Sequence, residues 1–139
     1  MKPFKVALVG IGTVGSGVFK VLQRNQTEIK ARTGRGIEIT VVADRNVNHA
    51  RSIVGDGVEV VDDAFAAVAR PDVDVVVELI GGYTVAKDLV LKAIENGKHV
   101  VTANKALLAV HGTEIFAAAQ QKGVMVAFEA AVAGGIPII

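Results

Sequence analysis

Short apolar runs rich in β-branched residues alternate along this chain with stretches whose apolar residues recur at helical spacing. Most of these runs are continuously apolar, which is typical of strands that helices cover on both faces. Strands that alternate with helices predict βαβ units around a parallel sheet. We therefore expect an α/β fold with strands at residues Phe4–Val9, Ile37–Ala43, Val58–Val61, Val73–Leu79, His99–Thr102 and Val124–Phe128.

The stretches between these strands predict helices. A long helix after the first strand and another after the fourth each place one apolar face toward the sheet. The second of these ends at Gly97, a residue type that commonly terminates helices. A third helix is expected over His111–Lys122, ended by Gly123, with shorter ones at Asn48–Val54 and Asp63–Ala69. The two long apolar faces consist of Val14, Val18, Val21 and Leu22, and of Ala86, Leu89, Val90, Ala93 and Ile94.

A glycine-rich turn, Gly10-Ile11-Gly12-Thr13-Val14-Gly15, follows the first predicted strand and opens the first predicted helix. This is the context that a dinucleotide-binding fingerprint requires. In that motif Gly10 permits the tight turn, Gly12 lets the backbone approach a pyrophosphate, and Gly15 lets the helix pack closely on the strand. The first N–H groups of the helix and its dipole then favour the phosphates. Glycine turns also arise for steric reasons alone, but these flanks favour a Rossmann-type, doubly wound sheet of order 3-2-1-4-5-6.

The second strand ends in two neighbours that favour different cofactors, Asp44 and Arg45. A carboxylate at this point bonds the adenosine ribose hydroxyls of NAD, whereas an arginine pairs with the 2′-phosphate of NADP. The distance from Gly15 to Asp44 exceeds the usual interval of about 20 residues, which a long first helix and the turn at 33–36 explain. These residues therefore do not decide between NAD and NADP. The alternative is that Asp44 and Arg45 are only an exposed pair at a strand end, without a role in binding.

Polar residues also follow the fourth and fifth strands, where the carboxyl ends of an open sheet border the ligand crevice. Glu78 precedes Leu79-Ile80-Gly81-Gly82, and Thr102 begins Thr102-Ala103-Asn104-Lys105. These residues are candidates for contacting the nicotinamide half of a dinucleotide. Glu78 is equally a candidate for a capping or turn residue, and Lys105 for a solvated surface lysine. The three histidines show no metal-ligand spacing.

Composition narrows the class of protein. The 139 residues are enough for one domain with a core, and 51% of them are hydrophobic while 21% are charged. A net charge of +1 gives no field that would attract nucleic acid or a membrane surface. No apolar run approaches the roughly 18 residues of a membrane span, and a signal-peptide pattern is missing. The chain has no cysteine, so this segment offers no disulfide, thiolate metal site or cysteine nucleophile. A cytoplasmic location is expected.

Several segments, taken together and in order, resemble homoserine dehydrogenase. The resemblance covers the whole chain, and its fifth-strand and C-terminal segments are far more specific than the glycine turn. The resemblance implies an oxidoreductase that reduces aspartate 4-semialdehyde to homoserine with NAD(P)H, on the route to threonine, isoleucine and methionine. The segments are residues 9–17 (VGIGTVGSG), Asn25-Gln26 with Ile29 and Arg32, residues 78–82 (ELIGG), 97–105 (GKHVVTANK) and 129–139 (EAAVAGGIPII).

This resemblance also implies roles for particular residues. Thr13 and Val14 would contact the pyrophosphate through backbone N–H groups, and Arg45 would meet the adenosine end, including any 2′-phosphate. Lys105, in the segment Thr-Ala-Asn-Lys, would lie beside the nicotinamide and the reacting carbon. A sodium ion would be held by all-oxygen ligands, a set that suits a hard cation. Those ligands would be the Glu129 carboxylate and the backbone carbonyls of Val132, Gly134 and Ile136.

The resemblance places the substrate-binding acids and the proton-donating lysine further along than this chain extends. The apolar end Ile138-Ile139 likewise leads us to expect a piece of a longer protein. We thus expect residues 1–139 to be one NAD(P)-binding domain, inactive alone, whose full-length form binds aspartate semialdehyde or homoserine and is a homo-oligomer. Neither a nucleic acid nor a membrane is expected as a partner.

Three alternatives compete with this interpretation. Aspartate-semialdehyde dehydrogenase shares the substrate but acylates a cysteine, and this chain has none. A regulatory domain that senses NAD(H) without catalysis would share the glycine turn, but it has no need of the Lys105 segment or the Glu129 loop. A purely structural Rossmann domain is the third.

Overall fold

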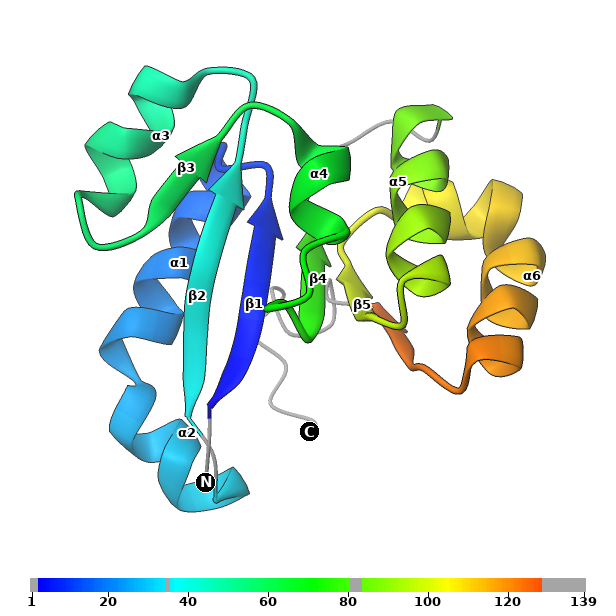
Figure 1. Ribbon diagram of the computed structural model, residues 1–139, viewed down its shortest axis with the longest axis horizontal. Helices are drawn as coiled ribbons and strands as arrows, with labels where there is room; N and C mark the ends of the chain where they lie inside the picture. Colours follow the sequence, from blue (N-terminus) through cyan, green and yellow to red (C-terminus); the bar gives the residue numbers. More distant parts are fainter. Residues whose placement is uncertain (1–2, 35, 81–83, 129–139) are drawn as a thin grey trace.

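The computed structural model describes residues 3–34, 36–80 and 84–128, and in them six strands form one parallel sheet (Figure 1). The order is β3-β2-β1-β4-β5-β6, which confirms the predicted doubly wound α/β fold. Three strands match their predicted bounds, and β3, β4 and β6 are shorter. The strands are β1 (Phe4–Val9), β2 (Ile37–Ala43), β3 (Glu59–Val61), β4 (Val75–Glu78), β5 (His99–Thr102) and β6 (Val126–Phe128).

Helices cover both faces of this sheet. On one face, Phe19 of α1 and Ala50 of α3 pack against apolar residues of β1 and β2. On the other, α4, α5 and α6 bury a second core that includes Leu89, Leu107 and Ile115. Each face thus buries its own apolar layer, which is the main stabilising contribution of such a fold. The helices are α1 (Thr13–Arg24), α2 (Gln26–Thr33), α3 (Val47–Val54), α4 (Ala64–Val68), α5 (Thr84–Glu95) and α6 (Lys105–Lys122).

A register shift in β2 decides which of its residues face each core. Val6 pairs with Ile39 but Ala7 pairs with Val41, so Thr40 is an extra residue in β2. Because side chains alternate along a strand, this one-residue insertion reverses the faces of all later positions. Ile39 therefore belongs to the α1–α3 core and Val41 to the α4–α6 core. The hydroxyl of Thr40 is buried without a hydrogen-bond partner, as a side chain at an irregular position of a sheet can be.

Three helix predictions need correction. The last helix begins at Lys105 instead of His111, because the side chain of Asn104 caps it by accepting a hydrogen bond from the N–H of Leu107 at 2.9 Å. The first helical stretch is two helices that meet at Asn25 rather than one long helix. Val21, predicted to be buried, is 50% exposed, because α1 turns only a narrower stripe, including Phe19, toward the sheet.

None of the helices in the described ranges is long and apolar enough to cross a membrane.

Candidate cofactor-binding site

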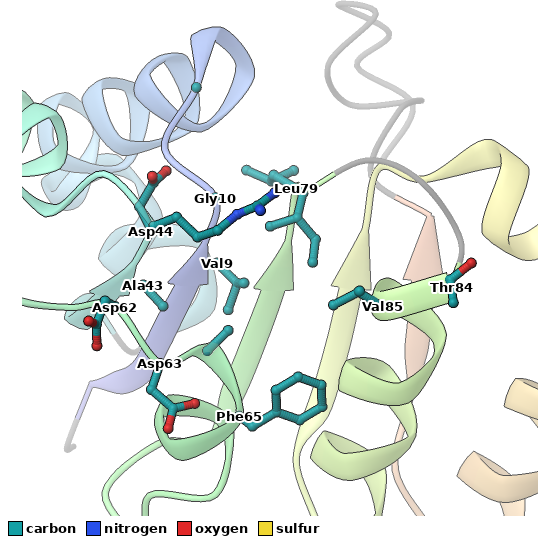
Figure 2. Close-up of a pocket in the computed structure, with 14 residues that line it drawn as sticks. Val9, Gly10, Ala43, Asp44, Asp62, Asp63, Phe65, Leu79, Thr84 and Val85 are labelled. Atoms are coloured by element: carbon teal, nitrogen blue, oxygen red, sulfur yellow. The ribbon is translucent and has the colours of Figure 1, made fainter.

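A cavity of about 910 Å³ lies at the carboxyl ends of β1, β2 and β4 (Figure 2). Its walls come from the turns that follow these strands, from the segment after β3 and from the start of α5. β1 lies between β2 and β4 in the sheet, and the connections after β1 and β4 lead to helices on opposite faces. Such a reversal leaves a crevice at the sheet edge, where open α/β sheets bind their ligands. The lining residues are Val9, Gly10, Gly12, Ala43, Asp44, Arg45, Asp62, Asp63, Ala64, Phe65, Leu79, Ile80, Thr84 and Val85.

The three glycines of the turn have three different environments. Gly10 has φ +93°, and a β-carbon there would also lie 3.0 Å from the backbone carbonyl of Leu79. Both the backbone conformation and the lack of space therefore disfavour a side chain at this position. A β-carbon on Gly15 would overlap the carbonyl oxygen of Gly10, which means that the first turn of α1 lies against the backbone of the glycine turn at a distance only glycine allows. Gly12 has no atom within 4 Å of its β-position. Its missing side chain therefore leaves open space on the cavity wall.

The N-terminus of α1 opens at this turn. Gly12 is the N-cap and, lacking a side chain, makes no capping hydrogen bond to the first turn. The Ser16 hydroxyl donates instead to the carbonyl oxygen of Ile11 at 3.0 Å, which ties the helix back to the turn. Thr13 and Val14 are the first two residues of α1. An uncapped helix N-terminus with a bare glycine before it suits an anion such as a pyrophosphate.

Asp44 joins the turn to the end of β2. Its Oδ2 accepts a hydrogen bond from the N–H of Ile11 at 2.8 Å, and its Oδ1 accepts one from the N–H of Asn46 at 2.8 Å. The side chain is half-buried, while the neighbouring Arg45 is exposed. Both residues line the cavity. The structure thus brings the predicted carboxylate and guanidinium to the same end of the site as the glycine turn.

Several cavity residues were missed in the sequence, among them two acidic and two large apolar ones. Asp62 and Asp63 follow β3, and Asp63 also caps α4 by accepting a hydrogen bond from the N–H of Ala66 at 3.1 Å. Phe65 and Val85 present apolar side chains that are 38% and 57% exposed, and Figure 2 places them on neighbouring walls. Exposed apolar side chains on a cavity wall suit the flat face of a base. Among these residues, only Asp62 and Asp63 had a signal in the sequence, which was their position directly after a predicted strand.

Thr102 and Lys105 do not line this cavity. Lys105 is exposed at the first residue of α6. Thr102 is completely buried, and its hydroxyl donates to Oε1 of Glu78 at 2.6 Å and accepts from the N–H of Asn104 at 3.0 Å. Glu78 is also completely buried. Burial raises the pKa of its carboxyl above the ordinary value, while hydrogen bonds from Thr102 and from the N–H of Ile80 oppose that shift.

The predicted sodium ligands Glu129, Val132, Gly134 and Ile136 lie outside the described residues. Within residues 3–34, 36–80 and 84–128, no three His, Cys, Asp or Glu side chains form a group that could hold a metal ion.

These features define the class of protein. A doubly wound parallel sheet carries a crevice at its switch point, a three-glycine turn, an open helix N-terminus and a carboxylate after the second strand. This set of features defines a dinucleotide-binding Rossmann domain.

Comparison with known proteins gives the family. Residues 10–129 match the family described as homoserine dehydrogenase, NAD binding domain. The chain belongs to this family. It is 63% identical over 139 residues to a homoserine dehydrogenase of Pseudomonas aeruginosa, covering 100% of this chain and 32% of that protein. The corresponding enzyme of Bacillus subtilis is 41% identical over the same length, with 32% of its chain covered.

Solved structures agree. A homoserine dehydrogenase from Thiobacillus denitrificans superposes with a TM-score of 0.89 and 55% identity, over 94% of this chain and 30% of that one. The Staphylococcus aureus homoserine dehydrogenase at pH 6.5 superposes with a TM-score of 0.85 and 37% identity, over 100% of this chain and 34% of that one. The chain therefore spans about a third of the length of the relatives it matches.

Proposed function

We propose that this chain forms the cofactor half of a homoserine dehydrogenase that interconverts L-aspartate 4-semialdehyde and L-homoserine with NADP or NAD. The observation that carries this proposal is the cavity at the switch point, where the glycine turn, the open N-terminus of α1 and Asp44 converge. The names of the relatives supply the reaction. When bound, the nicotinamide cofactor supplies or accepts the hydride.

The chain's own residues hold and orient the dinucleotide. Gly12 and the first-turn backbone of Thr13 and Val14 face the pyrophosphate, because the turn offers N–H groups and no side chain. Asp44 accepts hydrogen bonds from the ribose hydroxyls. Each of its oxygens already accepts one backbone N–H, and a carboxylate oxygen has a second lone-pair site for a ribose hydroxyl.

The adenosine end carries the choice of cofactor. The Arg45 guanidinium pairs with a 2′-phosphate when NADP binds, since it lines the cavity beside Asp44. The base lies against the apolar walls that Phe65 and Val85 present. Asp62 and Asp63 add negative charge to the same wall. Both NAD and NADP fit this end of the site, because Arg45 favours the 2′-phosphate while the carboxylates favour the ribose hydroxyls.

Lys105 and Thr102 belong to the nicotinamide end in this proposal. Lys105 starts α6 with its side chain exposed, so it is available to the nicotinamide and the reacting carbon. The Thr102 hydroxyl has both its donor and an acceptor site in use within the protein. It therefore supports the segment that carries Lys105 instead of bonding the cofactor through that hydroxyl.

A sodium ion beside the cofactor is part of the proposal, with Glu129 and the carbonyls of Val132, Gly134 and Ile136 as ligands. This part rests only on the resemblance of residues 129–139 to the family. An all-oxygen set of this kind suits a hard monovalent or divalent cation.

The whole protein's properties extend the proposal. Substrate binding and proton donation to the forming alkoxide fall to residues that the relatives carry beyond this third of their length. The complete enzyme acts as a cytoplasmic homo-oligomer in threonine, isoleucine and methionine biosynthesis. A domain that only senses NAD(H) is not favoured, because the match to the dehydrogenase family covers residues 10–129.

Two measurements test the proposed function. NADPH fluorescence, titrated with the 139-residue chain, should show saturable binding that NADP displaces. NADPH oxidation with aspartate semialdehyde should then be compared between this chain and a form extended to the length of its relatives. We expect turnover only from the extended form, because general-acid help typically contributes about 10²–10⁴ in rate and substrate positioning adds more. Equal turnover from both forms, or no NADPH binding by the chain, would contradict the proposal.

A further inference from the structure

A buried polar network connects the cavity wall to the helix that carries Lys105. We call it the Glu78 network; it comprises the side chains of Glu78, Thr102 and Asn104. Glu78 ends β4 and Thr102 ends β5, and the two residues are paired across the strands. Both are 0% exposed. The Glu78 carboxylate lies at the carboxyl edge of the sheet, where the cavity begins.

Each Glu78 oxygen receives one hydrogen bond. Oε2 accepts from the N–H of Ile80 at 2.9 Å, and Ile80 lines the cavity. Oε1 accepts from the Thr102 hydroxyl at 2.6 Å. The Thr102 oxygen also accepts the N–H of Asn104 at 3.0 Å, so this one hydroxyl joins Glu78 to the residue before α6. Both partners of the carboxyl donate, and these two bonds favour its ionised form while burial opposes it.

The network continues into α6. Asn104 caps the helix by accepting the N–H of Leu107 at 2.9 Å. Lys105 is the next residue after Asn104 and the first of the helix. A continuous series of hydrogen bonds thus runs from Ile80 on the cavity wall to the first turn that carries Lys105.

The side chains around the Glu78 network are aliphatic, so burying polar groups among them is energetically unfavourable. The same face of the sheet is otherwise aliphatic, with Val9, Val76 and Val100 in the core that Leu107 joins. Burying a carboxylate among such side chains is unfavourable, and aliphatic residues of similar volume commonly stabilise such a place equally well or better. An aliphatic pair makes no directional bonds, so it cannot fix the orientation of the segments that follow β4 and β5 as these hydrogen bonds do. Position, more than stability, is the property that this network provides.

We propose that Glu78 and Thr102 are positioning residues that hold the N-terminus of α6, and with it Lys105, in a fixed place relative to the cofactor cavity. The inference rests on the proposed function, which puts Lys105 beside the nicotinamide. Glu78 and Thr102 touch neither cofactor nor substrate in this role. Their effect reaches the reaction through Asn104 and the backbone of α6.

The test compares Thr102→Val with Thr102→Ser. Valine keeps the shape of threonine but removes both hydrogen bonds, whereas serine keeps the hydroxyl. Val100→Ala is the matched control, because it weakens the same strand and the same core while leaving the network intact. Glu78→Gln is the second variant, in which the new amide cannot accept from one of the two donors. All variants are made in the protein extended to the length of its relatives.

Amide hydrogen exchange at Asn104 and Leu107 reports the position of the helix start. We expect Thr102→Val to speed exchange there about tenfold or more relative to Val100→Ala, as the loss of a buried hydrogen bond implies. We expect kcat to fall about tenfold to a hundredfold, because a small displacement of a positioned group has effects of that size. The KM for NADPH should change little, and Thr102→Ser should restore both readouts.

Three results would overturn the inference. One is a folded Thr102→Val protein with ordinary exchange and kcat. Another is an equal loss of kcat in Thr102→Val and Val100→Ala, which would reduce the effect to general destabilisation. Should Thr102→Val not fold, Glu78→Gln decides in its place, and an unchanged kcat in that variant counts against positioning. Failure of the unsubstituted protein to bind NADPH would instead remove the proposed function, while the exchange data would still report whether the network holds α6.

Discussion

The carboxylate of Asp44 accepts a hydrogen bond from the backbone N–H of Ile11 at 2.8 Å, across 33 residues of sequence. The residue after the second strand therefore holds the middle of the glycine turn. Because Oδ1 of Asp44 also accepts from the N–H of Asn46, the carboxylate cannot rotate away without losing a bond. One side chain thus fixes the glycine turn and, in the proposed function, also faces the adenosine ribose.

Asp44→Ala should weaken both cofactors, and NADH more than NADPH. The substitution removes the acceptor of two backbone N–H groups and the proposed partner of the ribose hydroxyls, while it relieves repulsion of a 2′-phosphate. A hydrogen bond to a charged group contributes about 1.5–3 kcal/mol, or roughly tenfold to a hundredfold in affinity. Fluorescence titration with NADH and NADPH measures both losses. NADH affinity that stays at the original level would exclude Asp44 from the site.

Arg45→Ala should weaken NADPH by about tenfold to a hundredfold and spare NADH. The guanidinium lines the cavity and can pair with a 2′-phosphate through two N–H groups. Parallel titrations of the two cofactors provide the comparison, with Arg51→Ala on the exposed surface of α3 as the control. Equal weakening of both cofactors would show that Arg45 does not recognise the phosphate.

Gly12→Val should abolish NADPH binding while the fold persists. The β-position of Gly12 meets no protein atom within 4 Å, so a side chain enters only open space, where the pyrophosphate is proposed to bind. Binding is followed by fluorescence, and folding by circular dichroism and the melting temperature. A folded Gly12→Val protein with ordinary NADPH affinity would remove the turn from the binding site.

Gly15→Ala is the matched comparison within the same turn. Its β-carbon would overlap the Gly10 carbonyl oxygen, so the start of α1 must move away from the backbone at Gly10. Such overpacking typically costs about 1–3 kcal/mol of folding free energy. The melting temperature of Gly15→Ala should therefore be lower than that of the original protein, whereas the melting temperature of Gly12→Val should be unchanged.

Glu78→Gln should change how stability depends on pH. Burial raises the pKa of Glu78 in the folded protein above its ordinary value of 4.5. The folded state thus binds the proton more tightly than the unfolded state, so this group stabilises the fold fully below about pH 4.5. That contribution is lost as the pH rises through the higher folded pKa. Urea unfolding from pH 4 upward should show the free energy of unfolding of the original protein falling relative to that of Glu78→Gln; parallel curves would contradict the shift.

The pattern of the chain alone was enough for the class of fold, and it singled out the glycine turn that lines the candidate site. Apolar strand runs, helical faces and the three glycines are local signals, and Phe4–Val9, Ile37–Ala43 and His99–Thr102 have the bounds that these signals predicted. The cap at Asn104 was also a local signal, an asparagine before an apolar helical face, although it was missed.

The tertiary structure decided the features that depend on neighbours far away in sequence. Thr40 becomes an extra residue only because β2 pairs with β1 in a shifted register. Glu78 meets Thr102 because β4 and β5 are adjacent and in register, and Asp44 meets Ile11 because β2 lies beside β1. Phe65 and Val85 share a cavity although α4 and α5 are separate in sequence. Sheet order and register bring these groups together, and periodicity along one segment carries no information about which strand pairs with which.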